Sequence, residues 1–125
     1  MTAELVVARA TPSDIKYAQK CLEKTSNAKT TEEYEHWEGE LHVAIICAAR
    51  NNVLTGIYRS IDKARQQPEW KEIKRRSLND SRRERYERDH IAMVDAFTRR
   101  DAAALRHALK THLEAVSHNM LNAPD

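Results

Sequence analysis

The 125-residue sequence is poor in residues that interrupt helices, with only two glycines and three prolines. Alanine, leucine, glutamate, lysine and arginine dominate instead, and all five have high helix propensity. The composition therefore predicts helix nearly throughout and no β-sheet.

Cysteine, long apolar runs and a charge excess of one sign are scarce as well. Cys21 and Cys47 do not have the paired spacing of a metal site, and two thiols favour a reducing compartment over a disulfide scaffold. No run approaches the ~20 apolar residues of a membrane span, and the N-terminus lacks a signal-peptide pattern. The net charge of +2 excludes strong overall attraction to nucleic acid or anionic lipid. We therefore expect a cytoplasmic protein that does not enter a membrane.

Apolar spacing and helix-capping residues predict one domain, residues 1–125, built as an antiparallel bundle of six or seven helices. A short charged segment, at about 69–76, leaves the helix number open. The expected helices cover residues 1–9, about 11–25, about 30–50, about 52–66, about 80–100 and 101 onward.

Three of the six histidines lie among apolar residues one and two turns away, on three separate helices. These are His42, His90 and His112, and Glu38 precedes His42 by one turn on the same face. A buried imidazole needs a partner for its nitrogens, so this combination predicts a buried metal centre. The other three histidines share faces with polar residues and are expected in solvent: His36, His107 and His118.

One carboxylate and three neutral imidazoles suit a divalent ion such as zinc, and also nickel, cobalt, manganese or iron. The lack of a thiolate ligand argues against a structural zinc finger. An ion that accepts more than four ligands can also bind the oxygens of a small carboxylate.

Several stretches, in this order, resemble the effector-binding domain of GntR-type transcriptional regulators, the FadR-like C-terminal domain abbreviated FCD. They are Glu38-Gly39-Glu40-Leu41-His42, Ala48-Ala49-Arg50-Asn51-Asn52-Val53-Leu54, Asp89-His90-Ile91-Ala92-Met93-Val94-Asp95-Ala96, Arg100-Asp101-Ala102-Ala103-Ala104 and Thr111-His112-Leu113.

The resemblance implies an all-helical domain with a central metal and effector pocket, the metal being held by Glu38, His42, His90 and His112. The family usually has aspartate at the position of Glu38. Such regulators respond to organic acids, and they act as homodimers on operator DNA through an N-terminal winged helix-turn-helix. The sequence resembles the family from within its first effector-domain helix, so we expect that helix to be truncated and the DNA-binding domain to be absent.

Three further residues are candidates for effector binding. Asn51 matches a family asparagine near the pocket, although its place before a helix favours a capping role. Arg82 and Arg83 lie in a basic stretch, Lys71 to Arg88, that otherwise reads as a solvated face with Glu–Arg pairs.

Two other functions compete with a metal-dependent sensor of organic acids. A metal-dependent enzyme is one, because an ion with open positions can activate water, and Glu33-x-x-His36 and Glu87-x-x-His90 have the spacing of di-iron bundles. A metal-free dimerisation module is the other. We favour the sensor over an enzyme, since bridging glutamates on two other helices are not evident.

Overall fold

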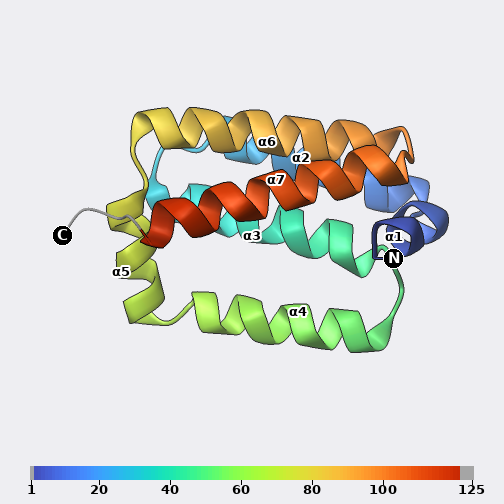
Figure 1. The fold of residues 1–125 in the computed structure, drawn as a ribbon, viewed down its shortest axis with the longest axis horizontal. Coiled ribbons are helices and arrows are strands. Elements are labelled where there is room, and N and C mark those ends of the chain that lie inside the picture. Colours follow the sequence, from blue (N-terminus) through green and yellow to red (C-terminus); the bar gives the residue numbers. More distant parts are fainter. Residues whose placement is uncertain (1, 122–125) are drawn as a thin grey trace.

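The computed structural model describes residues 2–121, which form helices and turns without a strand (Figure 1). The seven helices of this range are α1 (Thr2–Arg9), α2 (Pro12–Ser26), α3 (Thr31–Cys47), α4 (Asn52–Arg65), α5 (Pro68–Ser77), α6 (Asp80–Thr98) and α7 (Ala102–Leu121). The all-α prediction is confirmed. The short charged segment forms a helix of its own, α5, so the number of helices in this range is seven rather than six. Residue 1 of the first predicted helix and residues 122–125 of the predicted domain lie outside the described range. Within that range, no helix is both long and apolar enough to cross a bilayer.

Short polar side chains set the starts of the helices. Thr11 forms a capping box with Asp14 at the start of α2, and Thr30 accepts a hydrogen bond from a backbone N–H of α3. Asn51 and Asn79 cap α4 and α6 in the same way. These caps fix where each helix begins, and so fix the register of the side chains that each helix carries inward.

The end of α3 differs from the prediction, because the helix stops at Cys47 rather than near Arg50. Arg50 has a φ of 51°, a left-handed conformation that ends the turn after the helix. Its guanidinium lies 2.8 Å from the carboxylate of Asp14, and Arg9 donates to the carbonyl of Ala49 at 3.0 Å. These contacts tie the α3–α4 connection to the start of the chain.

The core lies among α2, α3, α6 and α7, which run lengthwise through the molecule (Figure 1). α2 is antiparallel to α3, and α6 is antiparallel to α7, while the short α1 closes one end. Five large apolar side chains of α3, α6 and α7 lose all contact with water: Leu41, Ile45, Met93, Phe97 and Leu105. The bundle therefore places the inner faces of α3, α6 and α7 against one another.

α4 and α5 lie outside this bundle. α4 packs on α3 and meets α5 at its end, and no residue of α4 is buried. α5 turns across one end of the bundle and contacts α7 (Figure 1). Two residues of α5 are buried even so, Lys74 and Ser77.

Candidate metal centre

Four side chains from three helices converge in the middle of the bundle. α3 supplies Glu38 and His42, which the four-residue spacing places on one face, while α6 supplies His90 and α7 supplies His112. One ligand atom from each residue can be chosen so that all four lie within 4.8 Å of one another. The ring centroids are 5.6 Å apart for His42 and His90, 5.3 Å for His42 and His112, and 4.7 Å for His90 and His112. The structure thus brings together the residues that the sequence singled out.

All four side chains are buried, and several of their polar atoms have no hydrogen-bond partner within residues 2–121. These atoms are Glu38 Oε2, His42 Nε2, both ring nitrogens of His90 and His112 Nε2. Leaving a buried polar group unpaired costs about 1–3 kcal/mol. A divalent cation bound among these lone pairs would supply the missing interactions, so the donor set fits such an ion.

The electrostatics favour the protonation states that a metal requires. Burial lowers the pKa of His42 well below its ordinary value and that of His90 to about 4, so both imidazoles are neutral at pH 7. Burial alone would raise the pKa of Glu38, but the charged and polar groups around it, Lys74 foremost, together outweigh this effect and hold that pKa far below its ordinary value. Neutral imidazoles and an ionised carboxylate are ready to bind a cation without releasing protons.

Lys74 is the principal partner of Glu38. Its Nζ lies 2.7 Å from Glu38 Oε1, and a guanidinium nitrogen of Arg65 lies 3.4 Å from the same oxygen. Lys74 is only 5% exposed. The prediction that its basic stretch is a solvated face is therefore wrong for Lys74, because an ion pair with a buried carboxylate draws it inward. The pairs of Glu72 with Arg75 and Arg76 do fit that prediction.

Asp89 supports His112 from outside the cluster. His112 Nδ1 lies 3.1 Å from Asp89 Oδ2, and both residues are buried. An ionised carboxylate only accepts hydrogen bonds, so this contact places the proton of His112 on Nδ1 and leaves the Nε2 lone pair free. Arg85 donates to the other oxygen of Asp89 at 3.2 Å. The sequence analysis did not identify Asp89, although it directly precedes His90.

The three predicted effector-binding residues lie outside the cluster and bond to the backbone. Asn51 accepts hydrogen bonds from two backbone N–H groups at the start of α4, which is the capping role that its position favoured. Arg82 donates to the carbonyl of Ser77 at 2.7 Å, and Arg83 donates to the carbonyl of Ala28 at 2.9 Å. Contact of these three side chains with an effector stays a prediction.

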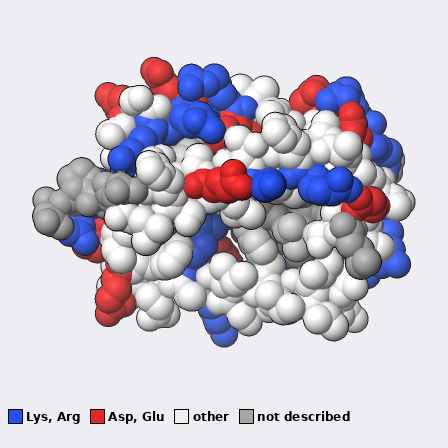
Figure 2. Space-filling model, viewed as in Figure 1, with Lys and Arg blue, Asp and Glu red and all other residues white. Residues whose placement is uncertain are grey.

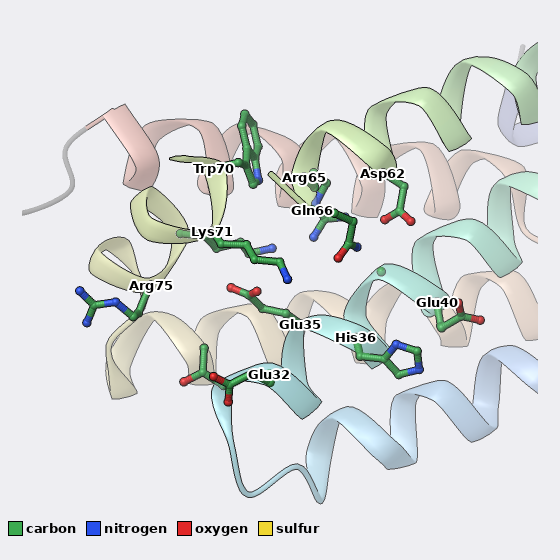
Figure 3. A pocket seen from close by; sticks show the side chains of 13 residues that line it. Glu32, Glu35, His36, Glu40, Asp62, Arg65, Gln66, Trp70, Lys71 and Arg75 are labelled. Carbon is green, nitrogen blue, oxygen red and sulfur yellow. The ribbon is translucent and has the colours of Figure 1, made fainter. Parts of the chain in front are cut away.

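A pocket of about 350 Å³ opens between α3, α4 and α5 (Figure 3). Arg65 and Lys74, the two cations that hold Glu38, also line this pocket. In Figure 3, Glu35 from α3 and Lys71 from α5 extend into the pocket from opposite sides. Burial raises the pKa of Glu35, although Lys74 opposes the shift. Arg65 and Lys74 thus link the pocket to the cluster, because each lines the pocket and also contacts the carboxylate of Glu38.

The other histidines lie apart from the cluster. His36 is exposed and its ring meets that of Trp37, while His107 and His118 are exposed on α7. The prediction that these three are solvated is confirmed. Since His36 faces outward, the Glu33-x-x-His36 spacing does not build a second metal site with the cluster.

Comparison with known proteins gives one family match. The model of the FCD domain matches residues 1–115, a range that contains all four side chains of the cluster and helices α1 to α6 in full. Among proteins of curated function, none matches the sequence.

Proposed function

The chain belongs to the FCD domain family, the ligand-sensing C-terminal domain of GntR-type regulators, and on this premise we propose that it senses a small organic acid through a divalent metal ion. Glu38, His42, His90 and His112 would hold the ion, for which zinc is the first candidate. The observation that carries this proposal is the convergence of four buried ligand atoms within 4.8 Å, several of them otherwise unpaired.

Charge favours a carboxylate as the ligand that is sensed. A divalent ion bound by one carboxylate and three neutral imidazoles keeps a net charge of +1 in a buried site. Lys74 and Arg65 add positive charge beside Glu38. An anionic ligand that occupies open positions on the ion would offset this charge, whereas a neutral ligand would not.

The positions of the four metal-ligating residues also suggest how binding of the acid could be transmitted to the rest of the regulator. They come from α3, α6 and α7, so an ion and its bound acid join three helices of the bundle. A shift of these helices would change how the two subunits of a dimer present their DNA-binding domains. Only the difference in acid affinity between two such arrangements regulates, and this difference is typically ~1–3 kcal/mol.

Elemental analysis combined with thermal unfolding tests the proposal. The purified protein should contain or take up close to one divalent ion per chain, and a panel of mono- and dicarboxylates should include a stabilising acid. At a hundredfold excess over its dissociation constant, that acid should add about 2.7 kcal/mol of stability. EDTA or His90→Gln should remove the effect, and the exposed His36→Gln should not.

Three outcomes would contradict the sensor. Stabilisation that persists after chelation would show that the acid binds independently of metal. Failure to bind any divalent ion would leave a metal-free dimerisation module, and turnover of the stabilising acid would indicate a metal-dependent enzyme.

A further inference from the structure

The pocket between α3, α4 and α5 has walls of opposite charge (Figure 3). The acidic and basic residues that α3 contributes to its lining are all carboxylates, among them Glu32 and Glu35. Those that α5 contributes are all cations, among them Lys71 and Lys74. On the molecular face in Figure 2, by contrast, groups of both signs lie next to one another. The pocket therefore separates positive from negative charge where the visible surface mixes them.

The two charged residues that α4 adds to the lining follow the same division. Asp62 lies against α3, since a Cβ added to Gly39 would come within 3.3 Å of Asp62 Oδ1. Arg65 lies beside Lys74, because both contact the same oxygen of Glu38. Asp62 thus extends the acidic wall, and Arg65 extends the basic wall.

Glu35 and Lys71 face each other across this pocket without pairing. They extend into it from opposite sides (Figure 3), and neither side chain forms a hydrogen bond or an ion pair with another residue of the described range. Glu35 is half-buried, so its carboxylate has lost part of its contact with water. A positive group beside Glu35 and a negative group beside Lys71 would give each of them a partner.

A ligand that carries both signs of charge matches these walls better than one that carries a single sign. A simple acid would pair with Lys71 and Arg65, but the carboxylates of α3 would repel it. An amine would pair with Glu35 and Asp62, but the cations of α5 would repel it. The pocket volume of about 350 Å³ lies at the lower end of the range for ligand sites, which favours a small molecule.

We propose that this pocket binds a free amino acid in its zwitterionic form. The ammonium group pairs with Glu35 and Asp62, and the carboxylate pairs with Lys71 and Arg65. Trp70 also lines the pocket and is 39% exposed, so its indole offers an aromatic surface to the side chain of the amino acid.

This site is separate from the metal centre, and the inference goes beyond the proposed function. None of the four side chains of the cluster is among the residues that line the pocket. The two sites are joined only through Arg65 and Lys74, which line the pocket and contact Glu38. Binding of the amino acid therefore requires no metal ion.

Isothermal titration calorimetry in EDTA tests the site, with the free proteinogenic amino acids as probes. EDTA excludes binding through a metal ion, which amino acids chelate. At least one amino acid should bind, at one molecule per chain. Its methyl ester and its analogue without the amino group should bind about tenfold or more weakly, because each lacks one charged contact. Failure of every amino acid to bind, or equal affinity for the ester or the analogue, would overturn the inference.

Two substitutions test whether binding occurs in this pocket. Glu35→Gln and Lys71→Met should each weaken binding by about tenfold or more. The matched controls Glu84→Gln and Lys63→Met change exposed residues outside the pocket and should leave the affinity unchanged. Far-UV circular dichroism should show that all four variants stay folded. Wild-type affinity in both pocket variants would overturn the inference. Every titration is carried out without metal, so failure of the metal centre and failure of this site can be told apart.

Discussion

Lys74→Met should reveal whether Glu38 is a metal ligand. The substitution keeps most of the side-chain volume, but it removes the ammonium that lies 2.7 Å from Glu38 Oε1. Glu38 is buried, so it would be left with the 3.4 Å contact to Arg65. In the metal-free protein, we expect a large loss of stability from this change.

The size of the loss follows from the burial of the pair. Removing one partner of a buried ion pair costs about 3–5 kcal/mol. Arg65, with a side chain only 14% exposed, retains part of the attraction. Glu38 can also become neutral by taking up a proton, which at pH 7 costs about 3.7 kcal/mol for a carboxyl with an ordinary pKa. This cost is an upper limit to the penalty of leaving the carboxylate unpaired. We therefore expect Lys74→Met to lower the free energy of unfolding by about 2–4 kcal/mol without metal.

A bound ion would change this result. If Glu38 coordinates the metal, the ion compensates the carboxylate, and the cost of Lys74→Met should fall to about 1 kcal/mol, the value of a single hydrogen bond. Urea unfolding of both proteins in EDTA and in excess zinc measures the two costs. The double variant Glu38→Gln/Lys74→Met should recover much of the loss, and the exposed Lys71→Met should change stability by less than about 0.5 kcal/mol. Equal costs with and without zinc would refute ligation by Glu38.

Three further predictions concern the histidines. His90→Gln should abolish measurable zinc binding in calorimetric titration, whereas the exposed His107→Gln should leave it unchanged. Asp89→Asn should weaken zinc binding by roughly 10–100-fold, because His112 loses the carboxylate that fixes its proton; unchanged affinity would show that this contact does not prepare the ligand. The metal-free protein should lose stability as pH falls from about 6.5 towards 4, since the unfolded chain protonates His90 near its ordinary pKa and the folded chain only near 4. Unfolding curves in EDTA across this range should show that decline, and His90→Gln should make it shallower, while His42, whose pKa is also lowered by burial, keeps part of it.

Helical periodicity was sufficient to predict most of the fold and the four members of the cluster. His42, His90 and His112 each repeat in phase with apolar neighbours, and Glu38 is locked to His42 by one turn of helix. Because the direction of a side chain from a helix is a local property, the sequence can show which residues point inward. The family resemblance then indicated that these particular residues meet.

The burial of Lys74 and the contact of Asp89 with His112 could not be predicted from helical spacing. Lys74 lies in a run of charged residues, and its burial is caused by Glu38, 36 residues earlier in the chain. The available signal was weak: Trp70, Lys74 and Ser77 share one face of α5 at helical spacing. Asp89 likewise has its partner far along the chain, since His112 follows it by 23 residues, on α7. Partners chosen by tertiary contact cannot be read from periodicity alone.

The cations beside Glu38 also affect whether such a centre could sense an acid or would only bind a metal ion. Lys74 and Arg65 already neutralise the negative charge of Glu38. The cluster therefore has little negative charge left to offset the positive charge of an incoming divalent ion. A structural metal site usually has enough anionic ligands to hold its ion unaided. Here an anionic acid would complete the balance, so ion and acid should each raise the affinity for the other by the same factor. That reciprocity makes the occupancy of the centre depend on the acid, as sensing requires.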